Sequence, residues 1–195
     1  IGLGLIREGM VAISLGTSDT YFGTMEACRV DPRGEGHVFV SPTGDYMTLI
    51  CFKNGSLARE NIREGYGLSW DEFSQALRDS PGGNDGKVML PYFEPEIVPN
   101  VLDPGVRRFG LQEDDVNGNC RAVIEAQMAS MRLHAQWMGV NPVAIYATGG
   151  ASVNQDILQV MADVQACPVH RFEVTNSAAL GAALRAAHGH LNAAG

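Results

Sequence analysis

Short runs of apolar residues alternate with polar turn residues over the first quarter of the chain, and this pattern predicts a β-hairpin. Val11–Leu15 and Tyr21–Met25 have β-strand character, and they flank Gly16–Asp19, whose residue types are those of turns. Met47–Phe52 has the same strand character. Three strands are therefore expected before any helix.

A helix and an irregular segment are predicted next. Asn54-Gly55-Ser56 is a turn with capping residues, and it leads into a helix over 57–64. Residues 66–112 break the pattern, because a short helix opening at Ser69–Phe73 is followed by a loop rich in Pro and Gly over 81–110. The segment 66–112 is expected to be an excursion from the core.

The second half of the chain alternates helices with strands. Apolar residues recur every three or four positions over 119–138, which predicts a long amphipathic helix. Strands are predicted at 143–147 and 169–174, with a helix after Gly149-Gly150 and a last helix capped by Asn176-Ser177. Strands linked through helices must run parallel, so the fold class is α/β, with a mixed sheet, an N-terminal hairpin and flanking helices.

Composition excludes several classes of protein. The chain has 195 residues, 45% of them hydrophobic, which is enough for a full core. Its formal charge of −8 and pI near 5.0 argue against nucleic acid or an anionic membrane as a partner. No secretory signal and no apolar run long enough to span a membrane is visible. The sequence indicates a cytoplasmic protein in which any phosphate recognition is local.

Two segments carry candidate chemistry, and the first is the hairpin turn. Gly16-Thr17-Ser18 offers a glycine and two hydroxyls, and a phosphate group needs such converging donors and a backbone that it can approach closely. The same residues also make ordinary turns. Taken alone, this segment leaves both interpretations open.

The second candidate segment begins where a buried strand ends. In α/β sheets ligands lie outside the carboxyl ends of strands, and Gly149–Asn154 occupies such a position. The glycines would let a flat base or ribose approach the backbone. Asn154 has both a donor and an acceptor for an adenine edge, yet it is equally suited to cap the following helix. Neither segment matches a Walker loop or a dinucleotide fingerprint, but together they would form two sides of one cleft.

The order of these segments resembles the FGGY carbohydrate kinases, a family of the actin-like (ribonuclease H-like) ATPase fold, and within it the xylulose kinases of the animal-like type. The resemblance covers most of the chain. Its matching stretches are Ile13–Thr20, Cys51–Leu57, Arg121–Glu125, Ala147–Ser152, Ala162–Val164 and Asn176–Ala183.

The resemblance implies a site for ATP with Mg²⁺. It places Gly16, Thr17 and Ser18 on the loop that meets the phosphates. It places Gly150, Ala151 and Asn154 on the adenosine pocket. Gly55 and Ser56 would line the other side of that pocket.

Two other segments bear on this resemblance. Asp19, where many bacterial relatives have Gly, favours the animal-like subgroup, and its carboxylate is expected either to orient Mg²⁺ through water or to serve as a turn residue. Pro91–Pro99 resembles a family segment written P-Y-L-x-G-E-R-T-P, but Pro95 replaces its Gly and Ile97 its Arg. Glu94 and Glu96 of this segment are expected to lie in a solvated loop.

Half of the catalytic machinery is expected outside this chain. By the resemblance, the catalytic Asp lies just upstream of Ile1, so residues 1–10 are a connector from an N-terminal lobe and 11–195 form the C-terminal kinase domain. The implied reaction transfers the γ-phosphoryl group of ATP to a sugar, D-xylulose first and ribulose or glycerol as alternatives. The N-terminal lobe and the sugar are the expected partners, and a homodimer is left open. A stand-alone nucleotide-binding or interaction module of the same fold is the other alternative.

Overall fold

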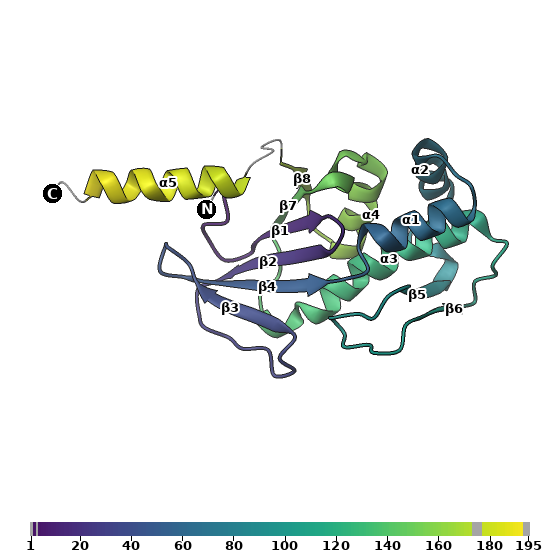
Figure 1. Cartoon of the computed structure of the whole chain (residues 1–195), viewed down its shortest axis with the longest axis horizontal. Coiled ribbons are helices and arrows are strands. Elements are labelled where there is room, and N and C mark those ends of the chain that lie inside the picture. Colours follow the sequence, from purple (N-terminus) through teal and green to yellow (C-terminus); the bar gives the residue numbers. More distant parts are fainter. Residues whose placement is uncertain (1, 3, 173–176, 193–195) are drawn as a thin grey trace.

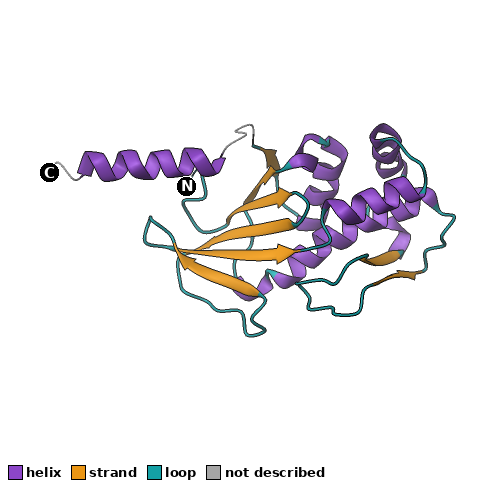
Figure 2. Ribbon diagram, in the orientation of Figure 1, coloured by secondary structure: helices purple, strands orange, loops and turns teal. Residues whose placement is uncertain are grey.

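The computed structural model describes residues 2, 4–172 and 177–192 and shows a mixed sheet with helices packed on one face (Figure 1, Figure 2). Six strands form the main sheet in the order β3-β4-β2-β1-β7-β8. Their bounds are β1 Met10–Leu15, β2 Asp19–Met25, β3 Gly36–Val40, β4 Tyr46–Phe52, β7 Ala144–Thr148 and β8 Val169–Arg171. The helices are α1 Ser56–Gly65, α2 Trp70–Asp79, α3 Val116–His134, α4 Gln155–Gln165 and α5 Ser177–Asn192.

The predicted hairpin and the parallel strands are confirmed. β1 pairs antiparallel with β2 and parallel with β7, and β7 pairs parallel with β8. In this register Ser14 lies opposite Thr148, one residue from the end of β1 and at the end of β7. The carboxyl ends of these two strands therefore meet at one edge of the sheet.

The hydrophobic core lies between the sheet and helices α1, α3 and α4. The inward side chains of β1, Val11, Ile13 and Leu15, are at most 1% exposed, and they share a cluster with Met128 and Met131 of α3. Burial of the apolar side chains of this core is the main favourable contribution to folding. This layer also fixes the strand ends relative to the helices, and so positions the loops that follow them.

Two predictions about the middle of the chain are wrong in part. β3 was not expected, because its five residues include one Gly and one His and several are exposed. Within 81–110, expected to be a loop, strands β5 Val88–Tyr92 and β6 Gly105–Phe109 form a separate two-stranded sheet. A proline in β5 and arginines in β6 hide the strand pattern, and packing of β5 against α3 overrides it.

Helix α5 extends away from the rest of the chain (Figure 1). Leu180 and Leu184 of this helix are exposed, and none of its residues is buried. The expected cap Asn176 lies outside the described residues. In the described ranges, no helix has the length and apolar character needed to cross a membrane.

Candidate functional site

The turn between β1 and β2 is hydrogen-bonded to the first residues of α1. Gly16, Thr17 and Ser18 form this turn. The Ser56 amide donates to the Gly16 carbonyl at 2.9 Å, and Arg59 Nη2 donates to the same carbonyl at 3.2 Å. The turn is therefore anchored to the helix by two hydrogen bonds to one oxygen.

Gly55 is required by the closeness of this contact. A Cβ at Gly55 would lie 2.7 Å from the Thr17 carbonyl oxygen, 2.8 Å from that of Gly16 and 2.9 Å from the Asp19 amide nitrogen. All three are backbone atoms, so no side chain can move aside. Gly55 lets the start of α1 pack directly under the turn, and its role in the site is support.

Asp19 and Arg59 form a buried ion pair beneath the turn. Arg59 Nη1 lies 2.8 Å from Asp19 Oδ2, and Nη2 lies 3.1 Å from Oδ1. Burial raises the pKa of the Asp19 carboxyl, and the Arg59 charge opposes this shift. Both carboxylate oxygens accept from the guanidinium, so the structure places Asp19 in a buried pair at the end of the turn.

The second turn follows β7 and needs glycine at its first position. Gly149 has φ +87°, and a Cβ there would lie 2.6 Å from the Leu15 carbonyl oxygen at the end of β1. At Gly150, by contrast, an added Cβ would meet nothing within 4 Å. The Ser152 hydroxyl donates to the Gly149 carbonyl at 2.7 Å and closes the turn. Gly150 thus presents bare backbone to open space.

Asn154 caps α4 with its carbonyl oxygen. Oδ1 accepts from the amides of Asp156 at 3.0 Å and Ile157 at 3.1 Å, while Nδ2 donates to the Ser74 hydroxyl at 2.7 Å. The capping interpretation of the sequence is therefore confirmed. The amide contacts protein groups at both ends, and these contacts fix the end of the Gly149–Val153 turn.

The two turns converge on one cavity of about 570 Å³. This volume is in the range of small-molecule sites. Six of the residues singled out from the sequence line it: Gly16, Thr17, Ser56, Gly150, Ala151 and Asn154. Ser18 and Gly55 do not line it. The strand register explains the convergence, because β1 and β7 end side by side.

The cavity also has lining residues that sequence reasoning missed, above all Trp70 and Arg59. Trp70 begins α2, is 42% exposed and has the Arg63 guanidinium 5.1 Å from its ring centroid. A large aromatic on an amphipathic helix is usually a core residue, so periodicity gave no signal. Arg59 is 0% exposed and its Nε lacks a partner within the described residues. The only available signal was a charged residue on the inner face of the predicted helix.

The expectation of a solvated loop at Glu94 and Glu96 is wrong for Glu96. Its carboxylate is 6% exposed and accepts from the backbone amides of Lys53 at 2.5 Å and Asn54 at 2.9 Å. Those amides are unpaired at the end of β4, and a buried carboxylate satisfies them. Glu94 is exposed, with Lys53 Nζ 3.7 Å away. Glu96 therefore ties the β5–β6 segment to the base of α1.

The described part of the chain offers no protein cage for a metal ion. Across residues 2, 4–172 and 177–192, no group of three or more His, Cys, Asp or Glu side chains is arranged to hold one. In the cavity, Glu60 is the one exposed carboxylate among the lining residues. A cation in this cavity would need most of its ligands from a bound molecule.

A family comparison matches nearly the whole chain. Residues 11–190 match the C-terminal domain of the FGGY family of carbohydrate kinases. The chain is 43% identical to a xylulose kinase of Rattus norvegicus over 195 residues, covering 94% of this chain and 36% of the relative. It is 40% identical to xylulose kinase 2 of Arabidopsis thaliana over 211 residues, covering 97% of this chain and 37% of the relative.

The fold is shared with solved structures. The structure of a xylulose kinase from Bifidobacterium adolescentis superposes with a TM-score of 0.82 at 27% identity, covering 92% of this chain and 37% of that one. The chain thus spans little more than a third of the length of the relatives that it matches. The α/β architecture with a mixed sheet is that of this group of proteins.

Proposed function

Because the chain belongs to the FGGY family of carbohydrate kinases, as its C-terminal domain, we propose that it is the lobe that binds ATP in a kinase for a small sugar. D-xylulose is the proposed substrate, since the curated relatives at 43% and 40% identity are xylulose kinases. The observation that carries the proposal is the convergence of the β1–β2 turn and the Gly149–Val153 turn on one cavity.

The proposed roles follow from what each side of the cavity exposes. Gly16 and Thr17 of the anchored turn line the cavity together with Ser56, and their backbone and hydroxyl groups suit phosphate oxygens; Ser18 is assigned to the same loop from its place in the turn. Gly150 and Ala151 leave room for adenosine against bare backbone, since nothing lies within 4 Å of a Cβ at Gly150. Trp70, at the start of α2, also lines the cavity and supplies an aromatic face for the base.

Mg²⁺ is proposed to bind together with ATP. Mg²⁺ keeps several waters and is commonly held by one or two carboxylates together with substrate phosphates. The cavity has phosphate-facing hydroxyls and Glu60 but no cage of carboxylates. We therefore assign the metal to the ATP phosphates and give Asp19 a structural role. The ion would neutralise charge on the transferred phosphoryl group.

The proposal assigns no catalytic base to this chain. Phosphoryl transfer to a sugar hydroxyl needs a base beside that hydroxyl, with the metal and donors over the phosphates. The described cavity supplies only the second set. The sugar and the base are assigned to the N-terminal lobe of a longer polypeptide, which is the proposed partner of this lobe.

Tryptophan fluorescence tests the proposal directly, because the chain has two tryptophans and only Trp70 lines the cavity. In a Trp137→Phe background, titrating ATP with Mg²⁺ is expected to quench or shift the emission of Trp70. Trp137 suits replacement, since its indole N–H has no partner in the described part of the chain. No sugar phosphorylation is expected from the isolated chain.

Two outcomes would contradict the proposal. An emission of Trp70 that does not respond to ATP would remove the nucleotide from this cavity. Phosphorylation of xylulose by the isolated 195-residue chain would show that a base is present after all. The matched control is Trp70→Phe, which keeps an aromatic face and is expected to retain more affinity than Trp70→Ala, measured by calorimetry.

A further inference from the structure

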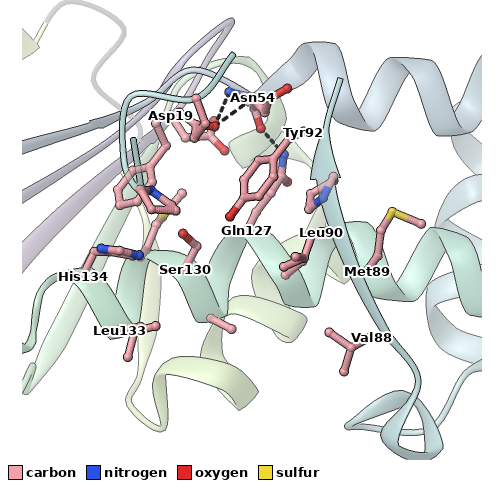
Figure 3. A pocket seen from close by; sticks show the side chains of 17 residues that line it. Asp19, Asn54, Val88, Met89, Leu90, Tyr92, Gln127, Ser130, Leu133 and His134 are labelled. Atoms are coloured by element: carbon pink, nitrogen blue, oxygen red, sulfur yellow. Dashed lines mark hydrogen bonds between the residues drawn. The ribbon is translucent and has the colours of Figure 1, made fainter. Parts of the chain in front are cut away.

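A second cavity lies on the other side of the Asp19–Arg59 ion pair, between strand β5 and helix α3 (Figure 3). Its volume is about 280 Å³. Asp19 and Gln127 form part of its wall, and both pair with Arg59, which lines the nucleotide cavity. The hydrogen-bonded side chains of Asp19, Arg59 and Gln127 therefore lie between the two cavities and separate them. We call the second one the β5–α3 pocket.

Apolar groups make up most of the wall of the β5–α3 pocket. The lining includes Met89 and Leu90 from β5, Ala126 and Met131 from α3, and Phe52 at the end of β4. Water gains few hydrogen bonds from such a wall, so a ligand that covers it is stabilised by the removal of apolar surface from water. The volume lies just below the usual range for ligand sites, which limits the ligand to about one ring with a short substituent.

Two hydroxyl groups converge inside this apolar wall. The hydroxyl of Tyr92, on β5, points across the pocket toward the hydroxyl of Ser130, on α3 (Figure 3). Within the described part of the chain, neither hydroxyl has a hydrogen-bond partner. Burial raises the pKa of Tyr92, so its phenol stays a donor at neutral pH. A ligand with one hydroxyl can both donate and accept between them.

His134 adds a third polar group at the end of the pocket. The side chain is buried, and its Nδ1 lies 2.8 Å from Glu35 Oε2. A carboxylate only accepts, so Nδ1 carries a proton in this contact and Nε2 is the ring nitrogen left for the pocket. The Glu35 contact also fixes the orientation of the ring.

The charges around the pocket set the sign of the ligand. Asp19 and Glu96 both line it, and their carboxylates are already paired, with Arg59 and with backbone amides respectively. Both groups carry negative charge, and the pKa of the neighbouring Cys51 thiol is raised by burial and then by Glu96 and Asp19. An anionic ligand would be repelled and would lose its hydration without a partner.

We propose that the β5–α3 pocket is a second ligand site, which binds a small neutral molecule made of one apolar or aromatic ring and one hydroxyl group. The ring packs between β5 and α3, and the hydroxyl bonds to Tyr92 and Ser130. The inference rests on the geometry of this pocket and does not depend on the proposed function of the nucleotide cavity.

Methionine-methyl NMR of the 195-residue chain tests the site, with benzyl alcohol as the probe. Met89 and Met131 line the pocket, whereas Met10 and Met161 do not and serve as internal controls. The probe is expected to shift the first two signals saturably and to leave the controls unchanged. Benzoate, which has the same ring with a negative charge, is expected to produce no saturable shift. Saturating ATP is expected to leave the probe in place.

Variants locate the probe within the pocket. Ser130→Ala removes one of the two hydroxyl partners and is expected to weaken binding about fivefold to tenfold. Ala126→Phe fills the pocket and is expected to abolish the Met89 and Met131 shifts. Ala187→Phe places the same ring on the exposed helix α5 and is the matched control, with affinity unchanged.

Several results would overturn the proposal. Shifts spread equally over all methionines, or no saturable shift at Met89 and Met131, would mean that the probe has no site here. Displacement of benzyl alcohol by ATP would place it in the nucleotide cavity. Unchanged affinity in Ala126→Phe would place it elsewhere on the chain, and equal binding of benzoate would remove the argument from charge.

Discussion

Arg59 donates to both carboxylate oxygens of Asp19 while neither side chain is more than 1% exposed. The pair joins α1 to the first residue of β2, directly after the turn that we assign to the phosphates. The same guanidinium reaches the Gly16 carbonyl and the Gln127 side chain. One buried cation thus holds the turn to two helices.

Removing this cation is expected to destabilise the chain strongly. Arg59→Met leaves the Asp19 carboxylate buried without a partner, and breaking a buried pair in this way costs about 3–5 kcal/mol in the free energy of unfolding. The double variant Arg59→Met, Asp19→Leu is expected to recover much of this loss, because no charge is then left buried. Urea denaturation of both variants measures the difference.

An exposed ion pair is the control for this prediction. Arg78 pairs with Asp156, but half of the Arg78 side chain is exposed. Arg78→Met is expected to change the free energy of unfolding by less than about 1 kcal/mol. Equal losses of unfolding free energy in Arg59→Met and Arg78→Met would show that the buried Asp19–Arg59 pair stabilises the fold no more than an exposed pair does. ATP affinity is expected to fall only when Arg59 is changed.

Two glycines of the site are expected to respond in opposite ways. Gly55→Ala places a Cβ against three backbone atoms at 2.7–2.9 Å, so it is expected to destabilise the fold by about 1–3 kcal/mol and to distort the turn. Gly150→Leu meets no atom near its Cβ, so it is expected to leave thermal stability nearly unchanged and to block ATP binding. Thermal melts and calorimetry distinguish the two effects.

This pair of variants also distinguishes a residue that holds the turn in place, Gly55, from a residue that contacts ATP, Gly150. If Gly150→Leu bound ATP with unchanged affinity, the cavity would not be the nucleotide site. If Gly55→Ala were as stable as the unchanged chain, α1 would not pack against the turn as closely as the 2.7–2.9 Å distances require.

Asn154 is expected to act through its cap. Asn154→Leu loses the hydrogen bonds to the amides of Asp156 and Ile157, which costs about 0.5–2 kcal/mol, and it loosens the turn, so ATP affinity falls as well. Asn154→Ser keeps a capping oxygen and is expected to retain most of both properties. Should Asn154→Ser be fully stable yet lose ATP binding, the amide itself would contact the base, contrary to our assignment.

The cap of α3 predicts a loss of stability in acid. The pKa of Asp115 is lowered first by the hydrogen bond from Lys87 Nζ and then by that from the Gly118 amide. A lowered pKa in the folded state stabilises the chain above the unfolded value of about 3.9, and this stabilisation is lost as the pH falls through the folded value. Asp115→Asn is expected to flatten that part of the pH dependence.

Denaturation at a series of acid pH values measures this effect. Lys87→Met removes the larger cause of the shift and is expected to flatten the curve in the same direction. A pH dependence that is identical in the unchanged chain and in Asp115→Asn would show that Asp115 titrates normally.

Local sequence determined the elements that depend on neighbours within a few residues. The hairpin, the short helix opening at Ser69, the cap at Asn154 and the amphipathic helix α3 were all predicted, because propensity and periodicity act over such distances. The chemical types of the two turns, with their glycines and hydroxyls, were visible for the same reason. So was the resemblance to the family, which lies in those segments.

Tertiary structure decided which of these residues meet and which are buried. Arg59 and Asp19 are 40 positions apart, and nothing local indicates that they pair. The sequence around Glu96 is that of a surface loop, but its carboxylate is buried because it accepts from the amides of Lys53 and Asn54 after β4. The register of β1 with β7 brings Gly16 and Gly150 to one cavity, and the packing of β5 on α3 creates the second. Contacts between distant segments depend on how whole layers pack, and the pattern of a single segment does not contain that information.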